Sequence, residues 1–321
     1  MKRFLVLAAY LLVAAFFAAP GIAAGLPDKE IRMLVAYKPG GQSDLIARKV
    51  SGIIEQNKFF QYPVVVNNIP GSGTRDALRT LRDAKADGST VLMHHNALLT
   101  MRSMNLLPWD YTEFTCIAQV TEAPMVVVVE NSKPWKSFAE LLADAKANPN
   151  KYSFALQGMG GNGHLITEKI LQMSKAQFKR ISYEGGGDSI AAQLGGHVDV
   201  RVSSLVETIS YMRAGQFRVL AVSSEQRLPE IPEVPTLQES GIDIVFTIKN
   251  GVLGPKNMPT PALRELEAII KKTVESDGFK SFCRENYMQP SFKGSVDYTA
   301  AFAKDWAIFK ELGPSLIAPQ K

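Results

Sequence analysis

An alternation of short apolar runs with glycine-rich turns and amphipathic stretches, which begins at Glu30, constrains the fold of this chain more than any other feature. Ile31 to Tyr37, Tyr62 to Asn67 and Ser89 to His94 are apolar runs of strand length, separated by stretches with helical periodicity. Continuous apolar runs that alternate with helices indicate strands of a parallel sheet covered on both faces. The sequence therefore predicts an α/β fold.

The same pattern starts again after Pro124 to Glu130, which is the most apolar run of the chain. Further strands are predicted at Tyr152 to Leu156, Lys179 to Tyr183 and Val198 to Ser203, and a return strand is predicted at Val245 to Leu253. Two helices near the end of the chain would then complete the first unit. This second series of strands and helices indicates a second lobe.

The length of 321 residues is sufficient for two lobes of ordinary domain size. We expect each lobe to be a mixed, mostly parallel sheet flanked by helices. The boundaries that we expect are residues 25–123 and 248–321 for lobe 1 and residues 124–247 for lobe 2. The two cysteines, Cys116 and Cys283, either form a bridge or remain two buried thiols, and the sequence leaves both open.

Residues 1–24 have the pattern of a secretory signal peptide. Lys2 and Arg3 form a basic start, an uncharged apolar run follows, and small residues place cleavage near Ala23 or Ala24. A membrane anchor fits less well, because the apolar run is short for a span and no basic stop-transfer segment follows it. We therefore expect a mature protein that is exported to the periplasm.

The balance of charge argues against a nucleic-acid partner. The chain has 36 basic and 31 acidic residues, a formal charge of +5, and two of the positive charges lie in the expected signal peptide. A nearly balanced mature chain lacks the basic patch that nucleic-acid binding requires. Hydrophobic residues at 46% and charged residues at 21% are typical of soluble globular proteins.

The predicted strands end in glycine-rich loops. In open α/β sheets, ligands bind outside the carboxyl ends of the strands. Here those ends carry Pro39-Gly40-Gly41, the segment Gln157 to Gly163 and the segment Glu184 to Gly187. A glycine turn lets the backbone approach a ligand closely, and the helix that follows offers unpaired N–H groups to an anion. Each loop alone is explained as well by an ordinary turn, so the prediction of a carboxylate site rests on the set.

Gly158 to Gly163 also fits the dinucleotide fingerprint G-x-G-x-x-G, with the acidic Glu184 at the end of the next predicted strand. Its position in the middle of an exported chain argues against a nucleotide, and we expect no cofactor. Gly187 to Ala191 only approaches the nucleophile motif G-x-S-x-G, because its fifth residue is alanine. The four histidines lack the spacing of metal ligands. We therefore expect no metal and no catalytic residue.

Several motifs occur in a characteristic order between Pro27 and Leu312. They are Pro39-Gly40-Gly41-Gln42-Ser43-Asp44, Val66 to Gly73, Asp87 to Thr90, Gln157 to Leu165, Ile181 to Gly185 followed by Gln193 to Asp199, Ile231 to Thr236, and Glu239 to Gly241. In sequence and order they resemble the motifs of the periplasmic solute-binding subunits of tripartite tricarboxylate transporters, the Bug or TctC-like receptors.

This resemblance implies a type II-like periplasmic-binding-protein fold, or Venus flytrap, whose two lobes are joined by two crossing strands. It implies a monomeric receptor that binds a mono-, di- or tricarboxylate, aromatic acids included, and delivers it to integral-membrane transporter subunits. The residues that would line the ligand site are Tyr37, Pro39, Gly40, Gly41, Gln42, Ser43, Asp44, His95, Asn96, Gln157, Gly158, Met159, Gly160, Gly161, Asn162, Tyr183, Gly185, Gly187, Ser203, Ser204 and Lys249.

The chain departs from the family pattern at Lys38, Gln157, Met159, Arg201 and Lys249. Two interpretations of Arg201 and Lys249 stay open: cations that pair a second carboxylate of the ligand, or solvated charges at the rim of the cleft. Two other functions also stay open. The same fold suits a carboxylate sensor that docks onto a sensor kinase, and, with less support, an exported α/β enzyme.

Overall fold

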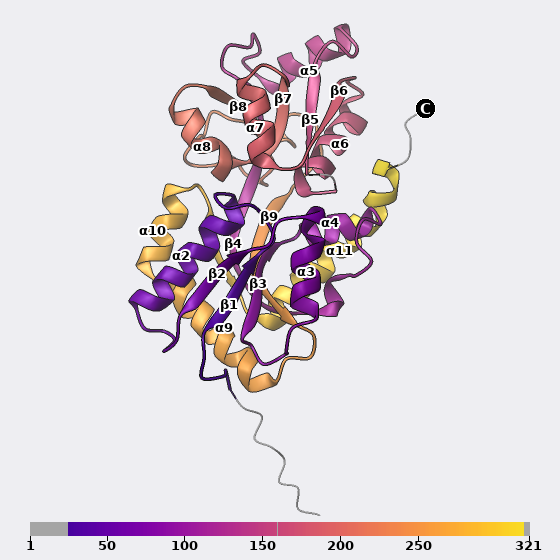
Figure 1. Ribbon diagram of the computed structural model, residues 1–321. Helices are drawn as coiled ribbons and strands as arrows, with labels where there is room; N and C mark the ends of the chain where they lie inside the picture. Colours follow the sequence, from indigo (N-terminus) through magenta and orange to yellow (C-terminus); the bar gives the residue numbers. More distant parts are fainter. Residues whose placement is uncertain (1–24, 159, 318–321) are drawn as a thin grey trace, which may run out of the picture.

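The computed structural model of this chain describes residues 25–158 and 160–317. The expected signal peptide and Met159 lie outside the described residues. Figure 1 shows two α/β lobes, one above the other, with strand β4 running from the lower lobe into the upper one. The prediction of a two-lobe α/β fold is confirmed by this arrangement.

Lobe 1 contains a sheet with the strand order β2-β1-β3-β9-β4-β10. The first three strands pair in parallel, whereas β9, β4 and β10 join in antiparallel pairs. The strands are β1 (Ile31–Val35), β2 (Val64–Asn68), β3 (Thr90–His95), β4 (Phe114–Glu130), β9 (Thr247–Pro255) and β10 (Gln289–Lys293).

Six helices cover this sheet, and the alternation of side chains along the strands explains how. On β1, Met33 and Val35 pack toward α2, α9 and α10, whereas Leu34 packs toward α3, α4 and α11. Figure 1 shows these two groups of helices on opposite sides of the strands. The helices are α2 (Gln42–Gln56), α3 (Arg75–Arg82), α4 (Ala97–Ser103), α9 (Thr260–Glu275), α10 (Asp277–Glu285) and α11 (Ser295–Ile317).

Lobe 2 contains a sheet with the strand order β8-β4-β7-β5-β6, so β4 belongs to both sheets. The strands β5, β6 and β7 pair in parallel, which places their carboxyl ends at one edge. The elements are α5 (Phe138–Ala147), β5 (Ser153–Gln157), α6 (Asn162–Ser174), β6 (Lys179–Tyr183), α7 (Gly186–Leu194), β7 (Val200–Ser204), α8 (Leu205–Arg213) and β8 (Phe217–Val222).

The chain passes between the lobes at two neighbouring places, within β4 and just before β9. Pro124 pairs with Thr247 in the first sheet, and the next residue, Met125, already pairs in the second. Ser223 connects the two passages: its hydroxyl accepts from Met125 N at 2.9 Å and donates to Phe246 O at 2.5 Å. Because Ser223 is almost completely buried, these bonds are shielded from water.

The two cysteines lie apart as free, buried thiols, Cys116 on β4 and Cys283 on α10. Burial raises the pKa of both thiols to about 12, so neither is a ready nucleophile. Among the described residues, no helix is both long and apolar enough to span a bilayer. The described part of the chain also contains no group of three or more His, Cys, Asp or Glu side chains arranged to hold a metal ion.

Candidate functional site

Loops from both lobes meet where the parallel strands end. Asn162, the first residue of α6, donates from Nδ2 to Asn96 Oδ1 of lobe 1 at 3.0 Å. Thr100 of α4 donates from its hydroxyl to Gly160 O of lobe 2 at 2.7 Å. The glycine loop of residues 157–163 therefore rests directly on lobe 1, on the side where β3 ends.

The start of α2 makes a second contact between the lobes. Ser204, which caps α8 in lobe 2, donates its hydroxyl proton to Gln42 Oε1 of α2 in lobe 1. The neighbouring Ser43 donates to Asn250 Oδ1 on β9 at 3.3 Å. All four side chains are buried, so the first turn of α2 lies inside the junction between the lobes.

The residues predicted from sequence differ in their burial. The buried ones are Gln42, Ser43, Asp44, Asn96, Gly160, Asn162, Ser203 and Ser204. The half-buried ones are Tyr37, Gly41, His95, Gln157, Gly158, Gly161, Tyr183, Gly185 and Lys249. Pro39, Gly40 and Gly187 are exposed, and Met159 is not among the described residues.

Asp44 organises the loop of residues 37–44. Its carboxylate accepts from Gly40 N at 2.9 Å, from Asn68 Nδ2 at 2.9 Å and from Arg48 at 3.0 Å. Burial acts to raise the pKa of this carboxyl, but the hydrogen bonds from Arg48, Gly40 and Asn68 outweigh it, so the pKa is lower than usual. Asp44 is therefore a positioning residue, which fixes the loop that leads into α2.

The loop of residues 157–163 is organised by glycine conformations and by a neutral histidine. Gly158 and Gly160 have φ values of 63° and 75°, which favour glycine. Gly160 N donates to His164 Nδ1 at 2.9 Å, and the pKa of His164 is lowered, chiefly by its burial. A side chain at position 160 would also strike Leu106, so this close approach of lobe 1 requires glycine.

Three helices start at the site with a glycine and without a capping side chain. The N-cap residues of α2, α6 and α7 are Gly41, Gly161 and Gly185, and no side chain within the described residues caps any of them. The first N–H groups of such helices have no partner inside the helix, and the helix dipole makes this end positive. This arrangement can hold an anionic group without any formally charged donor.

Some of the buried polar atoms that lack a hydrogen-bond partner belong to this site, and others are spread over both lobes. Among residues 25–158 and 160–317, those at the site include Tyr37 Oη and Gln42 Nε2 of lobe 1, and Gln157 Oε1 and Asn162 Oδ1 of lobe 2. Buried polar atoms in folded proteins are nearly always paired, so each such atom requires an explanation. These atoms come from both lobes and lie next to open helix ends. A polar ligand held between the lobes would provide them with hydrogen-bond partners.

Two histidines at the end of β3 complete the lobe 1 side. The ring of His95 stacks on Tyr37, with centroids 5.0 Å apart. His94 donates from Nδ1 to His95 O at 2.6 Å, and burial lowers its pKa to about 4. The pKa of His95 is also well below its usual value because of burial. Both rings are therefore neutral near pH 7 and add no positive charge.

Three basic residues depart from the family pattern, and two of them, Lys249 and Arg201, are candidate partners of a second ligand carboxylate. Lys249 Nζ lies 2.6 and 2.7 Å from the carboxylate oxygens of Asp305 on α11. Arg201 has an exposed fraction of 0%, so it is not a solvated rim charge. Its Nε donates to Gln193 Oε1 at 2.8 Å, and its guanidinium lies over Phe217. Its Nη1 and Nη2 are buried without a hydrogen-bond partner among the described residues. Burial lowers the pKa of Arg201 to about 10.

Glu207 is a member of the site that was not predicted from the sequence. Its Oε2 accepts from Gln157 Nε2 at 3.2 Å and from Ser203 Oγ at 3.3 Å. The signal available was Ser204-x-x-Glu207 at the end of a predicted strand, the spacing of a helix capping box. That pattern would have located the start of α8, and with it a carboxylate beside the predicted residues.

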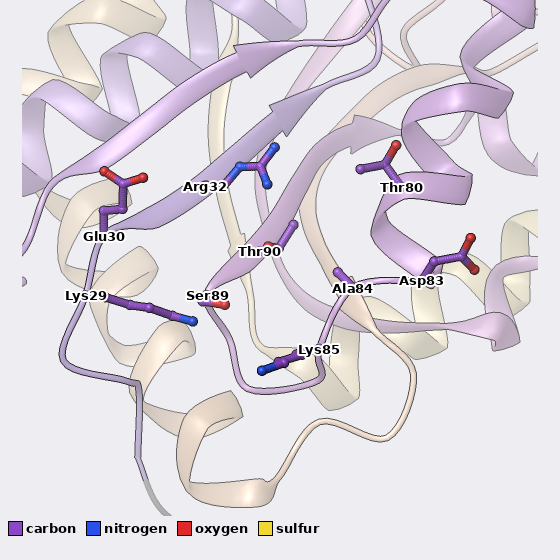
Figure 2. Close-up of a pocket in the computed structure, with 9 residues that line it drawn as sticks. All are labelled: Lys29, Glu30, Arg32, Thr80, Asp83, Ala84, Lys85, Ser89 and Thr90. Carbon is purple, nitrogen blue, oxygen red and sulfur yellow. The ribbon is translucent and has the colours of Figure 1, made fainter.

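A surface cavity of about 470 Å³ lies at the opposite end of lobe 1 (Figure 2). It adjoins the first residues of β1 and β3, whereas the candidate site follows their last residues. None of its nine lining residues has a buried polar atom without a partner. Its lining residues are Lys29, Glu30, Arg32, Thr80, Asp83, Ala84, Lys85, Ser89 and Thr90. The features of a ligand site therefore favour the junction between the lobes.

Comparisons of the sequence find a family and several relatives. A family model described as tripartite tricarboxylate transporter family receptor matches residues 46–312. A UPF0065 protein in the gbd 5′ region of Cupriavidus necator is 30% identical, over 94% of this chain and 95% of that protein. Protein BugT of Bordetella pertussis is 27% identical, over 98% of this chain and 99% of that protein.

Solved structures with the same fold include three proteins of lower sequence identity. The periplasmic binding protein BugD is 24% identical with a TM-score of 0.83, and 90% of this chain and 98% of that chain are covered. A Rhodopseudomonas palustris protein with adipate is 22% identical with a TM-score of 0.84, covering 90% and 98%. MatC from the same organism, with bound malate, is 19% identical with a TM-score of 0.82, covering 90% and 100%.

Proposed function

This chain belongs to the tripartite tricarboxylate transporter receptor family, and from that premise we propose that it captures a small organic carboxylate between its lobes and delivers it to a membrane transporter of the tripartite tricarboxylate type. The family is one of substrate-binding receptors, not of enzymes. The protein would then bind and release its ligand without changing it chemically.

The observation that carries the proposal is the cluster of unpartnered polar atoms between the lobes. Gln42 Nε2 is a buried donor next to the open start of α2, and the open start of α6 lies in the facing loop. A carboxylate placed there would accept hydrogen bonds from both lobes at once. That two proteins of this fold hold adipate and malate supports the same class of ligand.

The residues predicted from sequence divide into two roles in this proposal. Gln42, Ser43, Asn162 and the glycine loop face the ligand, and Asp44 holds the first of these elements in place. Because nearly all the donors are neutral amides and hydroxyls, affinity would come from their geometry and from exclusion of water rather than from a fixed counter-charge. Closure of the lobes around the ligand would provide that exclusion.

The remaining predictions follow from the same premise. We place the mature protein in the periplasm as a monomer, with integral-membrane transporter subunits as its partners. Cleavage of the leader near Ala23 or Ala24 stays a prediction, as do the lobe boundaries of 25–123 with 248–321 and of 124–247. Analysis of the exported protein by mass spectrometry would test both the cleavage position and the oligomeric state.

Mass spectrometry under native conditions, followed by a thermal-shift screen, tests the function. We expect an organic acid to co-purify, and we expect added acid at about 100 times Kd to stabilise the protein by about 2.7 kcal/mol. An inorganic salt at equal ionic strength is the control. A broad panel of mono-, di- and tricarboxylates that leaves the melting temperature unchanged would contradict the proposal.

A further inference from the structure

Gly160, in the loop of lobe 2, is held from both lobes through its own backbone. Its N–H donates to Nδ1 of His164 within lobe 2 at 2.9 Å, and its carbonyl oxygen accepts from the Thr100 hydroxyl of lobe 1 at 2.7 Å. A ring nitrogen that accepts a hydrogen bond carries no proton, so this arrangement needs the neutral form of His164. The bond between Gly160 and His164 therefore exists only while Nδ1 is unprotonated.

Contact with lobe 1 prevents the backbone at Gly160 from turning away from His164. A methyl group at this position would strike Leu106 and would lie 3.4 Å from Met101, and both residues belong to lobe 1. If Nδ1 gained a proton while the lobes are closed, two N–H groups would face each other in a buried place, which is costly. When the lobes separate, the contacts with Thr100, Leu106 and Met101 are lost. The backbone can then turn and accommodate a protonated ring.

The surroundings of His164 favour its neutral form. Burial is the main cause that lowers its pKa, while the negative charge of Glu168 on α6 acts to raise it and the positive charge of Arg180 on β6 acts to lower it. Glu168 is already engaged, because Nε and Nη2 of Arg180 lie 2.7 and 3.1 Å from its two carboxylate oxygens. His164 is also the third residue of α6, where the helix dipole disfavours a positive charge.

Other titratable groups occur on α6 itself and on the elements that pack against it, which are β5, β7, α4 and α11. None of those that the structure describes is among the charges that shift the pKa of His164. They are Lys169 on α6, Arg102 on α4, Arg201 on β7, and Asp297, Tyr298, Lys304, Asp305, Lys310 and Glu311 on α11. Protonation of His164 is therefore governed by its burial and by groups of lobe 2.

We propose that His164 is a positioning residue that makes ligand affinity depend on pH: its neutral ring holds the glycine loop in place for binding, and its protonation releases the loop and weakens binding in acid. This inference rests on the proposed function, because the loop of residues 157–163 is part of the ligand site. The closed form binds the proton less readily than the open form, so acid favours the open form. Full affinity should be present above about pH 6.5, the ordinary pKa of histidine, and should be lost as the pH falls below it.

Calorimetry at pH 7.5 and pH 5.5 tests the proposal, with adipate and malate as the first probes and a panel of mono-, di- and tricarboxylates behind them. Kd is measured for the wild type, His164→Asn and His164→Ala. Asparagine keeps an acceptor oxygen close to the position of Nδ1 and does not titrate. Because an ordinary histidine is about nine-tenths protonated at pH 5.5, the ratio of Kd at pH 5.5 to Kd at pH 7.5 should be about tenfold larger in the wild type than in His164→Asn.

The comparison of these ratios cancels the titration of the ligand and of other groups, which the two proteins share. His197→Asn changes an exposed histidine of the same lobe and should keep the wild-type ratio. His164→Ala removes the acceptor at every pH, so at pH 7.5 it should bind about fivefold more weakly than His164→Asn.

The outcomes separate this inference from the function on which it rests. Equal ratios in the wild type and His164→Asn would overturn the inference and leave the receptor function intact. Tighter wild-type binding in acid would do the same, because it would show that a charged ring attracts the ligand. If the variants do not fold, calorimetry of the wild type at pH 6 in buffers of different ionisation enthalpy decides, since we expect a net release of protons on binding and its absence would overturn the inference. Failure of every acid to bind at pH 7.5 would overturn both proposals.

Discussion

The two lobes shape their halves of the site by different physical means. The loop of lobe 1 is held by a buried carboxylate, Asp44, which binds Gly40, Arg48 and Asn68, all within the same lobe. The loop of lobe 2 is held by glycine conformations, by the hydrogen bond from Gly160 N to His164 within the lobe, and by contact with lobe 1 through Gly160 O. The lobe 1 loop is therefore fixed chiefly by one carboxylate of its own lobe, whereas the lobe 2 loop also depends on a contact with the facing lobe.

The largest expected effect is a loss of folding stability in acid. We expect lobe 1 to be more sensitive to acid than lobe 2, because it contains His94. The pKa of His94 falls from 6.5 in the unfolded chain to about 4 in the folded protein. The unfolded state therefore binds the proton more readily between these values, and stability present above pH 6.5 is lost as the pH falls toward 4. The loss amounts to about 3 kcal/mol, because each tenfold difference in proton affinity between the two states corresponds to ~1.4 kcal/mol.

Urea denaturation at pH 7, 5 and 4 would measure this effect. His94→Asn keeps a side-chain N–H donor and removes the titrating group, so its stability should depend less steeply on pH. His197→Asn changes an exposed histidine of lobe 2 and serves as the control. Equal slopes for the wild type and His94→Asn would contradict the assignment of acid sensitivity to lobe 1.

Removal of Asp44 should have the next largest effect. Asp44→Ala leaves Gly40 N without its acceptor and removes one of the two acceptors of Asn68 Nδ2, so we expect a loss of about 2–3 kcal/mol of unfolding free energy, together with loss of binding. Asp83→Ala removes a carboxylate from an exposed ion pair with Arg82 in the same lobe and should cost less than about 0.5 kcal/mol. Chemical denaturation and calorimetry of the two variants would measure both quantities, and equal losses would disprove a special role for Asp44.

A methyl group at Gly160 should act on the contact between lobes. Both Gly160→Ala and Gly196→Ala force alanine into a left-handed conformation, at φ values of 75° and 72°, which costs about 1 kcal/mol in each case. Only position 160 faces Leu106, since no described atom lies within 4 Å of the site of a new methyl group at 196. Binding should therefore weaken at least tenfold in Gly160→Ala alone.

Calorimetry would give the Kd of the two glycine variants, and denaturation would give their unfolding free energies. Together they would separate the backbone strain, which both variants share, from the contact with Leu106, which only Gly160→Ala disturbs. Equal affinities in the two variants would show that lobe 2 forms its loop without help from lobe 1. The proposed difference between the lobes, in which the lobe 2 loop depends on a contact with lobe 1, would then be wrong.

The smallest effect is expected for the ion pair between Lys38 of lobe 1 and Glu184 of lobe 2. Their charged atoms lie 3.7 Å apart, and both side chains are largely exposed. Solvent screens such pairs, so Glu184→Gln should change Kd by less than about twofold. Affinity measured at low and high salt would check this, and a larger, salt-dependent loss would mean that charge helps to hold the lobes together.

The fold was predictable where local pattern and tertiary environment agree. The predicted strand Lys179 to Tyr183 is β6 without change, and the glycine loops do follow the strands. The first ten residues of β4 were missed because Gln119 and Thr121 interrupt the apolar pattern. Both are buried, and their partners Ser291 and Asn250 lie far along the chain. Only the folded structure brings those partners near.

The loops of the candidate site could be predicted from the sequence. The partners of its charged side chains could not. Glycines at strand ends are a local signal, and the loops that contain them lie at the junction between the lobes in the structure. The ion pair of Lys249 with Asp305 joins residues 56 positions apart, so the sequence could not show that this charge is already neutralised. Glu207 was hidden for a related reason, because its spacing from Ser204 is explained equally well by a helix cap.

A strand shared by two sheets limits how the molecule can open. Since β4 and the segment that enters β9 are both tied to Ser223, the two connections act as one hinge, and the lobes can swing but not slide apart. The pairing of β4 with β9 changes register between Gln119 and Thr121, close to this hinge, where an irregular ladder bends more easily. Opening would therefore separate the lobe 1 loop from the lobe 2 loop, while the hydrogen bonds of Ser223 at the hinge remain in place.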